Sequence, residues 1–167
     1  MILGLIPSRL NSFRLKEKPL LEIDGLPIII HTLKRALLSK KIDRVIVCTD
    51  HKKIYDIVKK HGGEAMITSS KHVNGTERIA EVSKKIKSKL VVDIQGDEPL
   101  VDPKDIDKVI EFHLKNKNFD IVVPSMLTIS PDRNSLVKVL FNKHGKVLYF
   151  SRASVPYNFK KKKNWIL

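Results

Sequence analysis

The segment Asp93-Ile94-Gln95-Gly96-Asp97-Glu98-Pro99 places carboxylates and a glycine directly after an apolar run. Leu90-Val91-Val92 is typical of a buried strand, and Gly96 then turns the chain. Ligands of parallel α/β sheets bind at the carboxyl ends of strands, so we expect Asp97 at a ligand site. A carboxylate in that position can hold Mg²⁺ against a nucleotide phosphate. The segment therefore predicts phosphate chemistry on a nucleotide.

A second segment, residues 7–20, carries the cations that a phosphate group would need. It has neither the G-x-G-x-x-G pattern nor a Walker loop, so side chains would have to bind the anion. Arg9 and Arg14 can fork onto phosphate oxygens, and Lys18 can act as a point charge. A triphosphate carries about four negative charges at neutral pH, which these cations and Mg²⁺ would roughly balance. The alternative interpretation is a solvated polar loop.

Two further segments are weaker candidates on their own. Within His72-Val73-Asn74-Gly75-Thr76-Glu77-Arg78, Thr76 is the predicted N-cap of a helix. A glycine at a helix N-terminus lets a ligand approach the free backbone N–H groups. Arg152, after the apolar run ending at Phe150, is either a surface residue or a bidentate partner for a substrate carboxylate. The histidines lack metal-ligand spacing, so they predict no metal site.

Alternating strands and helices must position these segments. Apolar periodicity predicts strands over 2–6, 44–49, 65–68, 89–94 and 120–127, and helices over 27–39, 51–61, 76–87 and 103–115. Asp102 is the expected N-cap of the last helix, and Gly62 the expected stop of the second. Residues 137–141 and 146–150 flank Asn142-Lys143-His144-Gly145, a hairpin pattern. Strands separated by such helices imply a mostly parallel sheet.

Composition bounds the class of protein. A chain of 167 residues that is 42% hydrophobic is long enough for one core and too short for two. No apolar run approaches the roughly 18 residues that cross a bilayer. The first residues lack the pattern of a signal peptide. The single cysteine, Cys48, lies in an apolar strand and cannot form an internal disulfide. We therefore expect a cytoplasmic protein without a membrane partner.

The net charge of +14 comes mostly from lysines on predicted helix surfaces and in the run Lys160–Lys163. Nucleic-acid binders more often show arginines interleaved with aromatic residues on one face. Aromatic residues make up only 6% of this chain, and no such cluster occurs. A small anionic substrate explains the charge more simply. We expect no nucleic-acid partner, and we rank nucleic-acid binding third, below nucleotide chemistry and below nucleotide binding without turnover.

Taken in order, these segments resemble the cytidylyltransferases that activate 3-deoxy-manno-octulosonate (Kdo), the CMP-Kdo synthetases of lipopolysaccharide synthesis. The resemblance spans residues 2–157. Its motifs are Ile6-Pro7-Ser8-Arg9, Arg14-Leu15, Lys18-Pro19-Leu20, Thr49-Asp50-His51, Gly62-Gly63-Glu64, Gly75-Thr76-Glu77-Arg78 with Ala80-Glu81-Val82, Val92 to Pro99, and Leu148-Tyr149-Phe150-Ser151-Arg152-Ala153.

The resemblance implies a Rossmann-like, three-layer α/β nucleotidyltransferase fold with a mostly parallel sheet and a β-hairpin insertion near 137–150. Residues 1–157 would form the nucleotide-binding domain, and residues 158–167 a Lys-rich tail.

The resemblance also implies an activity and its residues. The activity is Mg²⁺-dependent transfer of CMP from CTP to the sugar's anomeric hydroxyl, with release of pyrophosphate. The implied catalytic residues are Arg9, Lys18 and Asp97, and Asp97 is the implied Mg²⁺ ligand. The implied nucleotide-binding residues are Pro7, Ser8, Arg9, Arg14, Lys18, His72, Asn74 and Gly75. The implied sugar-binding residues are Arg78, Gln95 and Arg152.

The chain departs from the family pattern in three places. Lys16-Glu17 stands where the family usually has Pro-Gly, which adds an anion beside the phosphate site, and Asn74 stands where Ser is usual. Family members also continue beyond residue 157 with a sugar-binding segment, a dimer helix and a final metal-binding Asp. We therefore expect a truncated or split gene product or a fragment, and a homodimer stays open because that helix is absent. The alternatives are a CTP-binding remnant without turnover and an enzyme for another acidic sugar, such as 8-amino-Kdo or a sialic-type acid.

Overall fold

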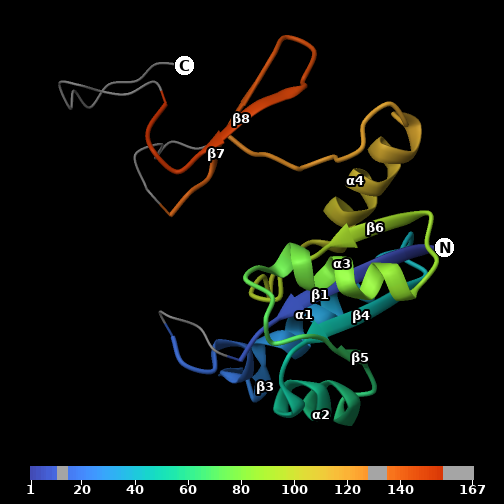
Figure 1. Ribbon diagram of the computed structural model, residues 1–167, viewed down its shortest axis with the longest axis vertical. Coiled ribbons are helices and arrows are strands. Elements are labelled where there is room, and N and C mark those ends of the chain that lie inside the picture. Colours follow the sequence, from blue (N-terminus) through green and yellow to red (C-terminus); the bar gives the residue numbers. More distant parts are fainter. Residues whose placement is uncertain (11–14, 128–134, 156–167) are drawn as a thin grey trace. The chain divides into compact units, whose positions relative to one another are not determined.

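The computed structural model describes residues 1–10, 15–127 and 135–155 (Figure 1). The chain divides into two compact units, Met1–Val122 and Val123–Leu167. The elements of the first unit are β1 (Ile2–Ser8), η1 (Lys18–Leu20), β2 (Glu22–Ile23), β3 (Leu26–Pro27), α1 (Ile28–Ala36), β4 (Arg44–Thr49), α2 (Lys52–Lys60), β5 (Glu64–Ile67), α3 (Gly75–Lys85), β6 (Leu90–Asp93) and α4 (Pro103–Lys115). The second unit contains β7 (Lys138–Phe141) and β8 (Val147–Ser151).

A four-stranded parallel sheet forms the centre of the first unit, in the order β5-β4-β1-β6. Every pair of neighbouring strands in it is parallel, so all four carboxyl ends lie at one edge. This confirms the predicted α/β class with a mostly parallel sheet. β1 extends to Ser8, two residues beyond the prediction, because Pro7 and Ser8 stay in register with the end of β4.

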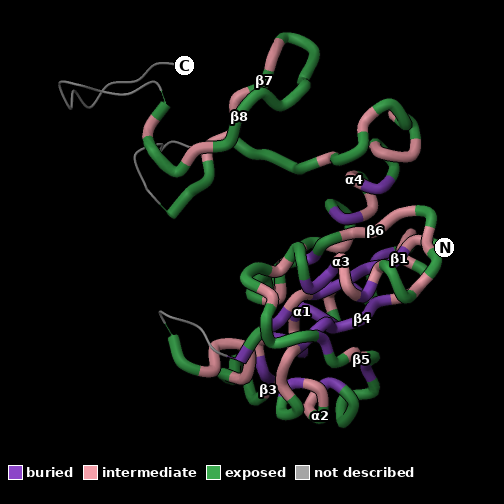
Figure 2. Tube along the Cα trace, viewed as in Figure 1, coloured by how far each residue is buried: buried purple, intermediate pink, exposed green. Residues whose placement is uncertain are grey.

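Helices cover both faces of this sheet, and the alternation of strand side chains determines which helix covers which face. Ile6, Val45 and Val47 point to the face covered by α1, α2 and α4. Leu3, Leu5, Ile46 and Cys48 point to the opposite face, where Ile79 and Val82 of α3 pack. Figure 1 shows α3 lying across the front of the sheet, and Figure 2 shows the buried residues concentrated along the strands. The unit is therefore a three-layer α/β/α structure.

The helix ends follow from local chemistry. Asp102 caps α4 as predicted, with its Oδ1 accepting the N–H of Lys104 at 2.9 Å. Gly62 follows α2 with φ of +75°, a left-handed conformation that glycine adopts without strain. The prediction for α3 was wrong by two residues: its N-cap is Asn74, not Thr76, because the Asn74 Oδ1 accepts the N–H of Glu77 at 2.9 Å.

The segment between the predicted strand 2–6 and the predicted helix 27–39 contains a small hairpin that the sequence analysis did not predict. β2 and β3 pair through the two-residue turn Asp24-Gly25, where both residues have positive φ. Asp-Gly is a preferred sequence for such a turn.

The second unit contains the predicted hairpin, with β7 antiparallel to β8 and an irregularity between Leu140 and Phe141. The strand predicted over residues 120–127 was wrong, because this segment pairs with no strand and is mostly exposed coil. Its β-branched residues favour a strand, but a strand also needs a neighbour, and Pro124 lacks a backbone donor.

Among the described residues, no helix combines the length and apolar character that a bilayer span requires. Cys48 is buried in β4, and burial raises the pKa of its thiol to about 12. It behaves as the small apolar side chain that its sequence context predicted.

Candidate active site

The carboxyl ends of β1, β4 and β6 bring the predicted segments to one edge of the sheet. Ser8 pairs with Thr49 at this edge, and Arg9 follows Ser8 in an exposed position. The Ser8 side chain is only 5% exposed, yet its Oγ has no hydrogen-bond partner among the described residues. Buried hydroxyls are normally paired, so this oxygen is available to a ligand group.

Pro7 is the point at which three of the predicted segments meet. A Cβ placed on Gly96 would lie 2.7 Å from the carbonyl oxygen of Pro7, and one on Gly75 would lie 3.1 Å from the Pro7 Cγ. The Gly96 carbonyl in turn accepts a 3.2 Å hydrogen bond from Thr32 Oγ1 on α1. The glycines therefore permit close contact between the end of β1, the start of α3 and the turn after β6.

Lys18 and Asp97 form an ion pair, with Lys18 Nζ 2.5 Å from Asp97 Oδ2. They are separated by 79 positions in the sequence, so only the fold brings them together. The Asp97 side chain is 51% exposed and that of Lys18 is 33% exposed. An opposite charge pair open to solvent can exchange its partner for a ligand, since such pairs contribute only about 0–1 kcal/mol.

Asp97 suits a magnesium–nucleotide complex better than a metal site built by protein alone. The described residues contain no group of three His, Cys, Asp or Glu side chains able to hold a metal ion. Mg²⁺ in nucleotide sites is usually bound by one or two carboxylates, phosphate oxygens and water. A single accessible carboxylate beside a lysine fits that donor set.

Glu17 precedes Lys18 in an unusual conformation. Its φ is +52°, in the left-handed region that favours glycine. Its carboxylate accepts a 3.1 Å hydrogen bond from Lys53 Nζ on α2. The extra anion that the sequence places beside the phosphate loop is thus paired with a cation, and Lys53 is a contact that sequence reasoning missed.

Gln95 and Asp93 are paired at the end of β6. The Gln95 Nε2 donates to Asp93 Oδ1 at 3.0 Å, which fixes the orientation of the amide. Burial raises the pKa of the Asp93 carboxyl, and the Gln95 hydrogen bond partly offsets that rise. This arrangement directs the side-chain oxygen of Gln95, Oε1, away from Asp93, where it can accept a hydrogen bond from a hydroxyl group.

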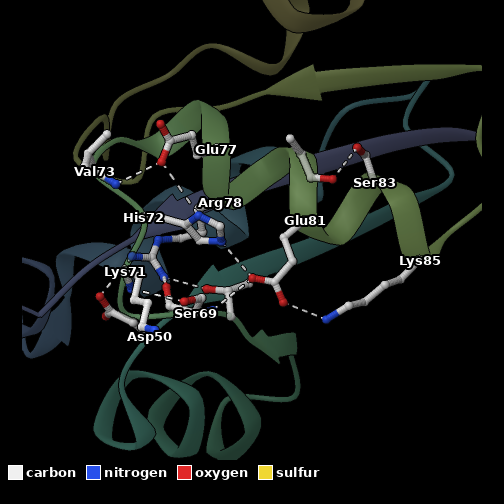
Figure 3. A network of polar contacts seen from close by, with 12 residues as sticks. Asp50, Ser69, Lys71, His72, Val73, Glu77, Arg78, Glu81, Ser83 and Lys85 are labelled. Atoms are coloured by element: carbon white, nitrogen blue, oxygen red, sulfur yellow. Dashed lines mark hydrogen bonds and ion pairs between the residues drawn. The ribbon is translucent and has the colours of Figure 1, made fainter.

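The loop between β5 and α3 is attached to α3 by a polar network (Figure 3). His72 Nε2 lies 2.8 Å from Glu81 Oε2, and the same oxygen accepts the Ser69 N–H at 2.9 Å. Lys85 Nζ lies 2.7 Å from the other oxygen, Oε1. Together the Lys85 ammonium, the Ser69 N–H and the His72 ring lower the pKa of Glu81 to about 2. Glu81 was in the family motif but was not predicted as a site residue.

Arg78 is buried on the sheet side of α3, with only 3% of its surface exposed. Its guanidinium donates to Asp50 Oδ2 at 2.9 Å and to Thr68 Oγ1 at 2.5 Å. These contacts tie α3 to the carboxyl ends of β4 and β5. The predicted contact between Arg78 and a sugar stays a prediction, and Asp50, which was in the family motif, was not predicted as a site residue.

Arg152 and Arg14 cannot be placed with the other site residues. Arg152 belongs to the second unit, where its Nη1 donates to the Ser135 carbonyl at 3.1 Å. Arg14 lies outside the described residues. The remaining predicted residues all belong to the first unit, so the nucleotide-binding predictions from Pro7 to Asp97 concern one structural body.

Comparisons with known proteins agree with this geometry. A family model described as cytidylyltransferase matches residues 3–166. The 3-deoxy-manno-octulosonate cytidylyltransferase of Chlamydia trachomatis serovar L2 is 40% identical over 162 residues, which cover 94% of this chain and 64% of the relative. The enzyme of the same name from Thermodesulfovibrio yellowstonii is 41% identical over 167 residues, covering 93% and 65%. The chain thus spans less than two thirds of the length of these curated relatives.

Solved structures show the same likeness. The structure of CMP:2-keto-3-deoxy-manno-octonic acid synthetase complexed with CTP matches with a TM-score of 0.84 and 32% identity, covering 98% of this chain and 68% of that one. A cytidylyltransferase from Leptospira borgpetersenii matches with a TM-score of 0.61 and 29% identity, covering 70% and 50%.

Proposed function

The chain belongs to the cytidylyltransferase family, and on this premise we propose that it binds CTP with Mg²⁺ and transfers CMP to an acidic sugar. The proposed acceptor is the anomeric hydroxyl of Kdo, the products are CMP-Kdo and pyrophosphate, and the pathway is lipopolysaccharide synthesis. The named activity of relatives at 40–41% identity supports the choice of sugar. The CTP held by the structural relative supports the choice of nucleotide.

The ion pair between Lys18 and Asp97 is the observation that carries this proposal. It brings the cationic segment after β1 within reach of the acidic turn after β6, as a bound triphosphate requires. On nucleotide binding, Lys18 would move to a phosphate oxygen and Asp97 would be freed to hold Mg²⁺. The ion, when bound, supplies positive charge against the phosphate oxygens.

The other site residues would orient the reactants. Arg9 and Arg14 would neutralise the triphosphate, Ser8 and the loop from His72 to Gly75 would hold the nucleoside, and Gln95 would accept from a sugar hydroxyl. The contacts of Arg78 and Arg152 with the sugar acid stay predictions, since the Arg78 guanidinium pairs with Asp50 and Thr68 and Arg152 belongs to the other unit. Charge neutralisation and positioning supply most of the rate in transfers of this kind.

CTP binding without turnover is the second candidate. The described part of the chain contains no group of three His, Cys, Asp or Glu side chains able to hold a metal ion, so Mg²⁺ would arrive with the nucleotide and could support binding without turnover. Pyrophosphate release from CTP and Kdo separates the two candidates.

Nucleotide selectivity provides the first test. With Mg²⁺ present, CTP should raise the unfolding temperature more than UTP, ATP or GTP. A ligand at a hundredfold excess over its dissociation constant stabilises by roughly 2.7 kcal/mol. The measurement is a thermal unfolding scan with each nucleotide, and equal shifts with all four would rule out the cytidine assignment.

Metal dependence provides the second test. Asp97→Asn removes the negative charge and should weaken Mg²⁺-dependent CTP binding about tenfold or more while the fold persists, since hydrogen bonds and contacts of charged groups are worth roughly 1.5–3 kcal/mol. Titration calorimetry with and without Mg²⁺ measures this. Glu98→Gln, which alters the adjacent exposed carboxylate, is the matched control and should bind like the unaltered chain. Unchanged metal dependence in Asp97→Asn would remove this residue from the site.

A further inference from the structure

We propose that Glu81 is a positioning residue for nucleoside selection, holding the loop of residues 69–74 against α3 and thereby fixing the part of the site that contacts the base. This inference rests on the proposed function, because contact between that loop and cytidine is part of it.

The Glu81 carboxylate contacts the loop at two positions, Ser69 and His72 (Figure 3). Its Oε2 accepts the Ser69 N–H at 2.9 Å and lies 2.8 Å from His72 Nε2. A carboxylate only accepts, so the ring nitrogen must carry the proton. One oxygen therefore fixes both the path of the backbone at Ser69 and the orientation of the His72 ring.

Glu77, one turn earlier on α3, holds the remainder of the loop. The Glu77 Oε2 accepts the Val73 N–H at 3.0 Å and lies 3.7 Å from His72 Nδ1. The Glu77 N–H in turn donates to Asn74 Oδ1 at 2.9 Å. The two carboxylates thus face the two nitrogens of the His72 ring, and they hold the loop backbone at Ser69 and at Val73.

Packing against the sheet makes α3 a rigid support for the loop. Ile79 and Val82 lie between and beyond these carboxylates in sequence, and both are buried against the sheet in the same cluster as Leu5 and Ile46. Because α3 is fixed by this packing, the loop that its side chains hold is fixed relative to the sheet edge. Selective recognition of a base requires polar groups held in one position.

The residues proposed to contact the phosphates lie in other segments than this loop. The phosphate-side residues Lys18 and Asp97 pair with each other and belong to other segments. Removing the Glu81 carboxylate should therefore release the loop without altering that pair. We therefore expect weaker affinity for the nucleoside part of the ligand and unchanged affinity for the phosphate part.

The experiment compares dissociation constants of CTP and inorganic tripolyphosphate, both with Mg²⁺, for the full chain and for Glu81→Ala. Alanine favours the helix, so α3 should remain intact. We expect CTP binding to weaken roughly tenfold, as for the loss of hydrogen bonds to a charged group, and tripolyphosphate binding to change less than about twofold. Hydrogen exchange at the Ser69 amide should accelerate in the same variant.

Two further variants complete the design. Lys85→Met removes the partner of Oε1 and leaves both loop contacts to Oε2, so it should bind both ligands like the unaltered chain. Glu81→Gln keeps one side-chain acceptor, so its affinity for CTP should lie between those of the unaltered chain and Glu81→Ala. It replaces Glu81→Ala as the test if that variant does not fold. Equal weakening of both ligands, or no weakening of CTP, overturns the positioning role. An unaltered chain that binds CTP no more tightly than tripolyphosphate overturns the proposed function instead.

Discussion

At the residue scale, Glu17 adopts a left-handed conformation at the N-cap of η1. Non-glycine residues lose about 1–2 kcal/mol in this conformation, and glycine does not. We therefore predict that Glu17→Gly unfolds at higher urea concentration than Glu17→Ala, by about 1 kcal/mol of unfolding free energy. Both variants lose the carboxylate, so their difference isolates the backbone.

Lys53→Met supplies the control for that comparison, since it removes the ion pair with Glu17 and leaves the backbone unchanged. An exposed pair of this kind is worth about 0–1 kcal/mol. If Glu17→Gly were no more stable than Glu17→Ala, the left-handed conformation would carry no cost in solution.

Single residues also show what sequence reasoning can reach. The proximity of Lys18 and Asp97 was predictable from opposite charges in two segments that each follow a strand of one sheet, whereas their role at a ligand site stays a prediction. The burial of Arg78 was not, since its charge suggested a ligand and only the fold supplies Asp50 and Thr68 as partners. Glu81 was hidden for the same reason, because its donors come from a loop whose path the sequence does not specify.

At the element scale, the close approach of β1 to the turn after β6 depends on a missing side chain. A Cβ on Gly96 would lie 2.7 Å from the Pro7 carbonyl oxygen, which is backbone and cannot move aside alone. We predict that Gly96→Ala lowers the unfolding free energy by about 1–3 kcal/mol, the usual cost of overpacking. Urea unfolding measures the loss.

Gly75→Ala is the matched variant, because its Cβ would lie 3.1 Å from the Cγ and 3.2 Å from the Cβ of the same proline, and both are side-chain atoms. It also sits at the start of α3, where alanine favours the helix. Its destabilisation should be the smaller of the two. A larger loss for Gly75→Ala would contradict the view that the Pro7 backbone is the rigid partner.

Elements were predictable where periodicity and end signals agreed. α4 matches its prediction because Asp102 and Pro103 mark its start, and β4 matches because both of its neighbours are in the same unit. Residues 120–127 failed because β-branched residues indicate a preference but cannot supply a pairing strand. The turn at Asp24-Gly25 was missed although its sequence carries a recognised signal.

At the scale of the whole molecule, the two units differ in how they bury apolar surface. The largest fully buried side chains of the described residues all lie between Leu3 and Ile110. In the hairpin of the second unit, by contrast, Phe141, Leu148 and Tyr149 are each at least 60% exposed. The first unit therefore has a complete core of its own, while the described part of the second unit has none.

This difference predicts the behaviour of a chain ending at Val122. It keeps every fully buried side chain among the described residues and the described residues that are predicted to bind the nucleotide, so it should unfold cooperatively within about 5 °C of the full chain, a shift typical of roughly 1 kcal/mol. It should also retain stabilisation by CTP with Mg²⁺, and bind less of a dye specific for exposed apolar surface because the hairpin is gone. Thermal unfolding by circular dichroism and dye fluorescence measure these properties. Loss of cooperative unfolding would show that residues after Val122 complete the core, and loss of CTP stabilisation alone would move part of the nucleotide site into the second unit.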